Sequence, residues 1–112
     1  MKYSIVETDE TISDVINFAK HMKYHFGNPK AAEDFVNAYD SVSEKLSIFP
    51  HGYRGIGLEY RGYEIRIKPF GTYNIFFIIA EEKHEIVILR VLKDRQNWNQ
   101  ILQINNDYHF EM

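Results

Sequence analysis

Residues 60–92 read YRGYEIRIKPFGTYNIFFIIAEEKHEIVILRVL, and this stretch decides the fold. In its first part apolar and polar residues alternate, which predicts a strand with one apolar and one polar face. The polar face carries Glu64, Arg66 and Lys68. A turn is predicted over 69–72. The segment 73–80 is apolar on both sides and predicts a central strand, and 85–92 predicts the next one.

Two helices are predicted ahead of this β region, because apolar residues recur at intervals of three or four. The two stripes consist of Ile12, Val15, Ile16, Ala19, Met22 and Phe26 in the first helix, and of Ala32, Phe35, Val36, Tyr39, Val42, Leu46 and Phe49 in the second. Each stripe is expected to face the core. Together they predict an antiparallel helical hairpin.

The ends of these helices carry recognisable signals. Thr8 or Thr11 can cap the first helix, and Gly27 is expected to end it. Asn28 followed by Pro29 is typical of an N-cap with proline at the first helical position. Pro50 ends the second helix. The connection between the helices is therefore short.

The remaining segments are less regular. Residues 2–6 alternate weakly and could form a first strand, and 51–57, which hold three glycines, are expected to form a loop. Asp94 is a candidate cap for a short closing helix. The buried side of that helix would carry Trp98, Ile101 and Leu102. The expected fold is α+β, with a helical hairpin, a twisted antiparallel sheet and a short C-terminal helix.

The 112 residues are enough for one domain, expected to span 1–112. The absence of cysteine excludes a disulfide scaffold, a thiolate zinc site and a cysteine nucleophile. The longest apolar run, 75–80, is too short to cross a bilayer. The opening MKYSIVETDE lacks the apolar core of an export signal. We therefore expect a cytoplasmic protein without a membrane partner.

Charge is distributed unevenly along the chain. The net charge is −3, from 13 Lys and Arg against 16 Asp and Glu, which is unlike a dedicated nucleic-acid binder. Basic residues nevertheless concentrate in 60–80 and 90–95. His21 and His25 lie one helical turn apart, but no third ligand is spaced with them, so we expect a solvated pair and no metal or other cofactor.

Several weak motifs occur in a characteristic order: NPKAA at 28–32, LSIFP at 46–50, YEIRIKPFGTYNIFFII at 63–79 and IVILRVLKDRQNW at 86–98. In that order they resemble the RelE/ParE superfamily of toxins from bacterial type II toxin–antitoxin systems. The resemblance covers about residues 2–102. It implies a growth-inhibiting toxin with the hairpin-on-sheet fold and a cognate antitoxin whose flexible segment wraps and blocks it.

In RNA-cleaving members of this superfamily, a ribose 2′-hydroxyl attacks the adjacent phosphodiester, which requires a base, cations for the developing charge and an acid. The resemblance assigns catalytic roles here to Arg66, Lys68, Glu64, Lys93 and Arg95. It assigns substrate binding to Arg61, Tyr73, Asn74 and Arg90. With the hairpin on the apolar face, the polar residues of 63–70 would lie on the open face and form a basic surface suited to a phosphate backbone.

Two positions depart from the superfamily pattern. Its tyrosine–arginine pair is present here as Tyr73–Asn74, and Asn74 can donate a hydrogen bond but cannot neutralise a phosphorane. One lysine position holds Glu64, which could serve as the general base, as a carboxylate does in some relatives, or could equally repel RNA. Arg90 could equally be held in a structural ion pair, for instance with Glu85 or Asp94.

Three functions are therefore compatible with the sequence, of which the first is favoured and the other two are alternatives. The first is a metal-independent endoribonuclease that cleaves mRNA in the ribosome (an mRNA interferase). The second is a ParE-like toxin that poisons DNA gyrase by binding, without enzymatic activity. The third is a disarmed relative that only binds an antitoxin.

Overall fold

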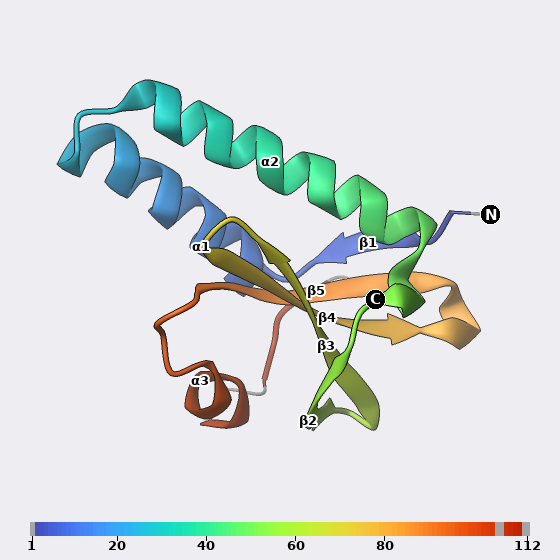
Figure 1. The fold of residues 1–112 in the computed structure, drawn as a ribbon. Helices are drawn as coiled ribbons and strands as arrows, with labels where there is room; N and C mark the ends of the chain where they lie inside the picture. Colours follow the sequence, from blue (N-terminus) through green and yellow to red (C-terminus); the bar gives the residue numbers. More distant parts are fainter. Residues whose placement is uncertain (1, 105–106, 111–112) are drawn as a thin grey trace.

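The computed structural model describes residues 2–104 and 107–110, and Figure 1 shows their arrangement. The elements are β1 (Ser4–Glu7), α1 (Asp9–Lys20), the π-helical turn η1 (His21–His25), α2 (Pro29–Ile48), the 3₁₀ turn η2 (Pro50–Gly52), β2 (Gly55–Tyr60), β3 (Tyr63–Phe70), β4 (Tyr73–Ala80), the 3₁₀ turn η3 (Glu81–Lys83), β5 (Glu85–Lys93) and α3 (Trp98–Ile104). The hairpin of α1 and α2 covers one face of the sheet, and α3 lies on the other. The expected α+β class is confirmed.

The strand order is β1-β5-β4-β3-β2. Strands β2 to β5 pair antiparallel, as expected. Strand β1 adds to β5 in parallel, so the sheet is mixed. A parallel neighbour requires a crossover, and the helical hairpin supplies part of it.

The helix ends follow the sequence signals. The Thr8 hydroxyl accepts the Thr11 N–H at 3.0 Å and caps α1. The Asn28 side chain accepts the Ala31 N–H at 3.0 Å and caps α2, with Pro29 in the first turn. Gly27 has φ of +63°, a left-handed conformation that favours glycine. The chain therefore reverses within a few residues.

The buried side of α1 is more polar than its apolar stripe predicts, because a β-bulge interrupts the pairing of β5 with β4 next to it. The Thr11 hydroxyl donates to the Ile88 carbonyl at 2.8 Å, and the Thr8 hydroxyl donates to the Leu89 carbonyl at 2.9 Å. The Asp14 carboxylate accepts the Val91 N–H at 3.0 Å. These side chains bond to backbone groups of β5 at its irregular part, where β1 has ended; the Ile88 carbonyl also accepts the Thr8 N–H.

This polar contact rotates part of the expected stripe away from the core. Ile12 and Ile16 are 43% and 46% exposed, and Phe26 is exposed at the hairpin tip. Phe49, the last residue of the second stripe, is also exposed. The other stripe positions are buried or half-buried. The prediction that both complete stripes face the core was therefore wrong at these four positions.

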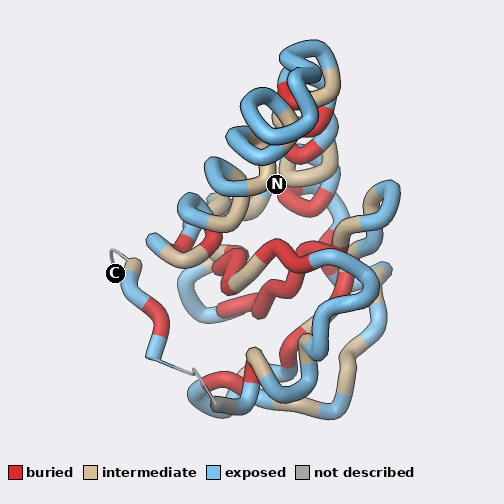
Figure 2. The backbone as a smooth tube through the Cα atoms, turned by 90° about the vertical axis from the view of Figure 1, so that its left-hand side faces the viewer, coloured by how far each residue is buried: buried red, intermediate tan, exposed pale blue. Residues whose placement is uncertain are grey.

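Each face of the sheet carries its own core, so β4 is buried on both sides, and Figure 2 shows the buried backbone between the two layers. On the hairpin side, Ile75, Phe77 and Ile88 pack against Tyr39 and Leu46 of α2. The core of the opposite side comprises Tyr60, Ile65, Ile67, Phe76, Ile78, Val87, Leu89, Leu92, Leu102 and Tyr108. Both sides of the sheet therefore exclude water.

Three local predictions were wrong, the last of them in part. The expected loop at 51–57 contains the start of β2, because Gly55 pairs with Arg66 across an irregular register. Asp94 does not cap α3; the side-chain Oδ1 of Asn97 accepts the Gln100 N–H at 3.4 Å. The expected turn at 69–72 is shorter, because β3 continues through Phe70.

Candidate functional site

The polar residues of β3 lie on the same side of the sheet as the hairpin. Arg66 pairs with Phe77 and Lys68 pairs with Ile75, and both partners belong to the core beneath the helices. Directly opposed residues of paired strands point to the same face. The expectation that Glu64, Arg66 and Lys68 would lie on the face away from the hairpin was therefore wrong, because Ile65 and Ile67 fill the second core instead.

Arg66 is held by its neighbours. Its Nη1 donates to the Tyr53 carbonyl at 2.8 Å, and its Nη2 lies 3.9 Å from the Glu64 carboxylate. The Arg66 side chain is 24% exposed, whereas that of Glu64 is 53% exposed. The Glu64 carboxylate lies over Gly55, where an added Cβ would come within 2.1 Å of its Cδ. Glycine at this position leaves room for the carboxylate beside Arg66.

Aromatic rings position the two nearby lysines. The Lys68 ammonium lies 4.9 Å from the centre of the Tyr53 ring, within the range of a cation–π contact. The Lys93 ammonium lies 5.9 Å from the rings of both Phe18 and Tyr73. Both lysines therefore present charge next to apolar surface on the hairpin side.

Tyr73 and Asn74 do not act as a pair, because consecutive strand residues point to opposite faces. The Tyr73 ring packs on Phe18 and Phe35, with centroids 5.0 and 4.7 Å away, and burial raises the pKa of its hydroxyl. Asn74 is buried, and its Nδ2 donates to the Asp94 carboxylate at 2.8 Å. Asn74 thus fastens the turn after β5.

Arg90 is held in a structural ion pair, and its partner is Asp14 instead of Glu85 or Asp94. Its Nε and Nη2 donate to the two Asp14 oxygens at 2.7 and 2.8 Å. Both side chains are largely buried, and the bonds to Asp14 raise the pKa of Arg90. The Val91 N–H also donates to Asp14, so three N–H groups of β5 donate to one carboxylate of α1 and hold the two elements together.

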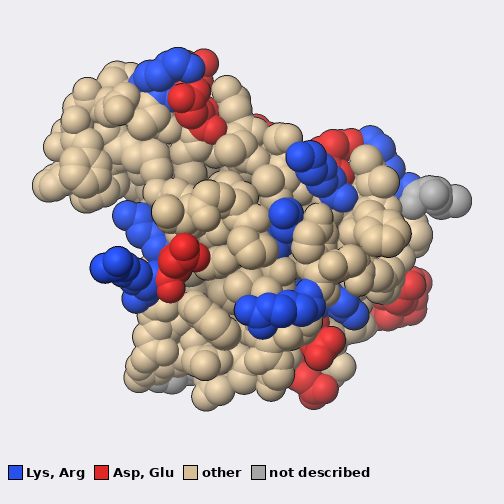
Figure 3. Space-filling model, viewed as in Figure 1, with Lys and Arg blue, Asp and Glu red and all other residues tan. Residues whose placement is uncertain are grey.

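Two further basic residues lie at separate places. Arg61 occupies the turn between β2 and β3 with φ of +52°, and its guanidinium lies over the rings of Tyr60 and Phe110. Arg95 is exposed in the turn after β5. Figure 3 shows Lys and Arg side chains distributed across the face below α2.

The structure thus brings together part of the predicted set. The residues that share the hairpin side of the sheet are Glu64, Arg66, Lys68, Tyr73 and Lys93. Arg61, Asn74 and Arg90 lie elsewhere or are committed to other contacts. Tyr53 was missed, because its segment was expected to be a loop; it carries the Lys68 contact and the Arg66 acceptor. We call Tyr53, Arg66, Lys68, Tyr73 and Lys93 the basic–aromatic surface.

A comparison with family models gives a match over residues 5–98 to the ParE toxin of the type II toxin–antitoxin system parDE. The chain belongs to this family of toxins. The expectation of a type II toxin, drawn from the order of weak motifs, is confirmed.

Seven chains of solved structures also match this ParE-family toxin. One belongs to the crystal structure of the toxin–antitoxin complex RelBE2 from Mycobacterium tuberculosis. It is 22% identical, covers 83% of this chain and 99% of its own, and superposes with a TM-score of 0.57. At that identity the likeness shows a shared fold. A search of curated protein sequences gave no match.

The described residues contain neither a cluster of metal ligands nor a helix that could span a membrane. Within residues 2–104 and 107–110, no three His, Cys, Asp or Glu side chains converge as a metal site would require. His21 and His25 are exposed, and their rings stack with centroids 4.5 Å apart. None of the described helices combines the length and apolar character needed to span a membrane.

Proposed function

We propose that this ParE-family toxin arrests growth by binding DNA gyrase through the basic–aromatic surface, without cutting RNA. The observation that carries the proposal is the commitment of Arg90 to Asp14 and of Asn74 to Asp94. Phosphodiester cleavage needs cations that converge on one phosphorane. Two of the groups expected near the scissile phosphate are instead engaged in holding the fold together.

The groups that are not held in such contacts suit a binding surface. Lys68 and Lys93 each lie over aromatic rings, which combine apolar contact area with positive charge. Aromatic and cationic side chains of this kind are enriched among residues that dominate binding energy. Their partner would present acidic or phosphate groups next to apolar surface. Gyrase bound to DNA offers both.

As a toxin of a type II system, the protein has a cognate antitoxin as its partner. An antitoxin segment that folds on binding would bury the same surface and block access of the target. This arrangement explains how one protein is harmless in the complex and inhibitory when free.

The test is an assay of purified toxin on gyrase supercoiling and DNA cleavage, together with incorporation of labelled thymidine and methionine after expression. We expect lost supercoiling and an early fall in thymidine incorporation. The double variant Lys68→Ala/Lys93→Ala should lose the effect. Lys30→Ala removes an exposed lysine from α2 and should keep it. Unchanged gyrase activity with the folded, antitoxin-free protein would overturn the proposal.

The second candidate is cleavage of mRNA in the ribosome, favoured by one observation. The Glu64 carboxylate lies 3.9 Å from Arg66, with Lys68 on the same strand face, so a base and two cations lie close together. In that case methionine incorporation would fall first, and both Glu64→Gln and Arg66→Ala would stop cleavage. Toxicity that persists in both variants at matched expression would exclude this site.

A further inference from the structure

Strand β1 has an open edge. Ser4 N–H donates to the His84 carbonyl at 3.0 Å, and Thr8 N–H donates to the Ile88 carbonyl at 3.2 Å. In a parallel pair, alternate residues bond to the neighbour and those between them point outward. The backbone groups of Ile5 and Glu7 therefore point away from β5. In the described part of the chain, no other segment forms a hydrogen bond with these backbone groups.

The two ends of this edge are covered. Tyr3 N–H donates to the Ser47 carbonyl of α2 at 2.8 Å, and Asp9 N–H donates to the His109 carbonyl at 2.7 Å. The Ser47 and His109 carbonyls thus already bond to the edge on either side of Ile5 and Glu7. The open part is a short window, which limits non-specific strand pairing but accommodates a short extended segment.

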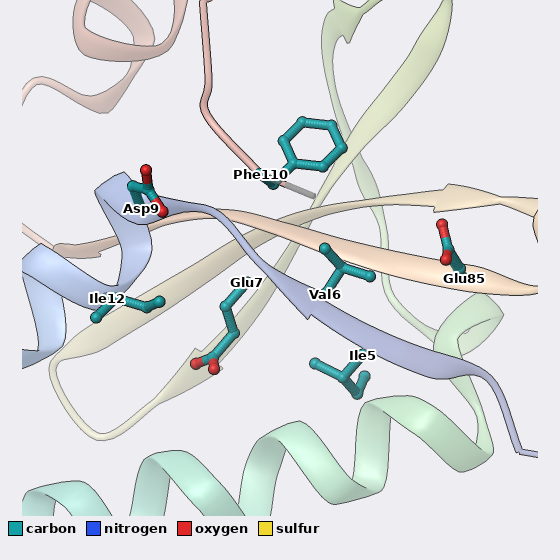
Figure 4. A pocket seen from close by; sticks show the side chains of 7 residues that line it. All are labelled: Ile5, Val6, Glu7, Asp9, Ile12, Glu85 and Phe110. Carbon is teal, nitrogen blue, oxygen red and sulfur yellow. The ribbon is translucent and has the colours of Figure 1, made fainter. Parts of the chain in front are cut away.

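A groove of about 470 Å³ lies along this window, and Figure 4 shows the side chains that line it. Ile5 and Glu7 point from β1 toward α2, whereas Val6 and Phe110 lie on the opposite side of the strand. A strand added to the edge would direct its alternate side chains to these same two sides. Each side then offers an apolar contact.

The charge of the groove defines the occupant. Its ionisable lining residues are Glu7, Asp9 and Glu85, and none of the described residues that line it is a lysine or arginine. The Glu7 carboxylate accepts the Tyr39 hydroxyl at 2.5 Å, which fixes its position. Three carboxylates around an open strand edge favour Lys or Arg on the incoming segment.

We propose that the β1 edge is a second interaction surface, which binds a basic, extended segment of a partner protein with alternating apolar residues. The outward N–H and C=O groups of Ile5 and Glu7 supply the backbone bonds, and the carboxylates select the charge. This surface is distinct from the basic–aromatic surface, which attracts acidic groups. It therefore does not depend on the gyrase proposal.

The test uses synthetic peptides and ¹⁵N-labelled full-length toxin. The probe is the peptide KVKIKVK, and the controls are EVEIEVE and KVKIKVK that is N-methylated at every internal residue. We expect KVKIKVK to shift the amide signals of Ile5 and Glu7 and to slow their hydrogen exchange. Neither control peptide should do so, because one carries the wrong charge and the other cannot form strand hydrogen bonds.

Protein variants locate the binding. Glu85→Lys should weaken KVKIKVK binding about fivefold, as expected for a surface charge pair. Glu33→Lys makes the same charge change at an exposed position of α2 and should leave binding unchanged. Glu85 is half-buried, so its replacement by lysine can disturb folding as well as binding. Asp9, which is exposed, therefore provides a second variant of the groove, Asp9→Asn.

Three results would overturn the proposal. The first is the absence of shifts at Ile5 and Glu7 at millimolar KVKIKVK. The second is equal binding of the N-methylated peptide, which would mean charge attraction without strand addition. The third is equal loss of binding in the Glu33→Lys control, which would mean that only the net charge matters. If the toxin had no effect in the gyrase assay, by contrast, the expected peptide results would be unchanged.

Discussion

The Asp14–Arg90 pair gives the sharpest stability prediction. Asp14→Ala removes the partner of a largely buried guanidinium and leaves the Val91 N–H without its acceptor. Breaking a fully buried pair costs about 3–5 kcal/mol. The side chains of Arg90 and Asp14 are 18% and 13% exposed, so water can compensate part of the loss. We expect the free energy of unfolding to fall by about 2–3 kcal/mol.

Urea unfolding followed by circular dichroism measures this change, and Tm should fall by about 8–12 °C for a chain of this length. Arg90→Met keeps the apolar stem of the side chain and removes the charge. In that background Asp14→Ala should cost only the bond to Val91, about 1 kcal/mol. The difference between the two costs is the coupling energy of the pair.

The matched control is Glu33→Ala, which removes an exposed carboxylate from α2 and should change stability by less than about 0.5 kcal/mol. If Asp14→Ala is as stable as this control, Asp14 does not hold α1 to β5. If Asp14→Ala costs the same stability in the native protein and in Arg90→Met, the two side chains are not coupled, and the destabilisation comes from the lost Val91 bond alone.

Three further predictions follow from polar contacts of α1 and β1. His109 donates a side-chain hydrogen bond to the Glu10 carboxylate, which raises the pKa of His109 above its usual 6.5. Burial tends to raise the pKa of Glu10, but the backbone and side-chain bonds that it accepts from His109 outweigh burial and lower that pKa below 4.5. The ion pair should therefore be complete between the lowered pKa of Glu10 and the raised pKa of His109; it should weaken as pH rises through the pKa of His109 and as pH falls through the pKa of Glu10. An NMR titration should show that the pKa of His109 returns to its usual value in Glu10→Gln. An identical pKa of His109 in both proteins would contradict this. Thr8→Ala should cost about 2 kcal/mol in urea unfolding, because it removes the helix cap and a buried donor, whereas Thr8→Ser should stay within about 1 kcal/mol of the native protein. Burial and the bond to Glu7 both raise the pKa of Tyr39, so its hydroxyl stays protonated and donating; Tyr39→Phe should lose about 1 kcal/mol, and an unchanged stability would show that water replaces the bond.

The helical hairpin could be predicted because its signals are local. Asn28 and Pro29 act within one helical turn, and both are in the expected roles. The long apolar runs of β4 and β5 were equally clear. The short strand β2 was missed, because glycines at 55 and 57 normally indicate a loop and only the pairing with β3 makes this segment a strand.

The face occupied by Arg66 could not be predicted from alternation. The pattern shows that Ile65 and Ile67 share a face, but it does not say which of two apolar layers they join. Here the second layer is built by α3 and Tyr108, which lie far along the chain. The buried polar side of α1 has a similar cause, because the bulge in β5, next to which Thr8, Thr11 and Asp14 bond to the strand, has no signature in the sequence of α1.

The pairing of β1 with β5 has a consequence for biosynthesis. Ser4 pairs with Glu85 and Glu7 pairs with Ile88, so during synthesis β1 has no partner until more than 80 further residues have been added. Contacts between such distant residues form late, because the intervening chain must first be ordered. The hairpins β2–β3, β3–β4 and β4–β5, by contrast, join consecutive segments. A nascent chain that stalls before β5 can fold its helices but cannot seat α1, whose Thr8, Thr11 and Asp14 contacts all lie on β5. Truncated translation products of this toxin should therefore be unfolded substrates for proteolysis, and inhibition would begin only with chains that have passed residue 91.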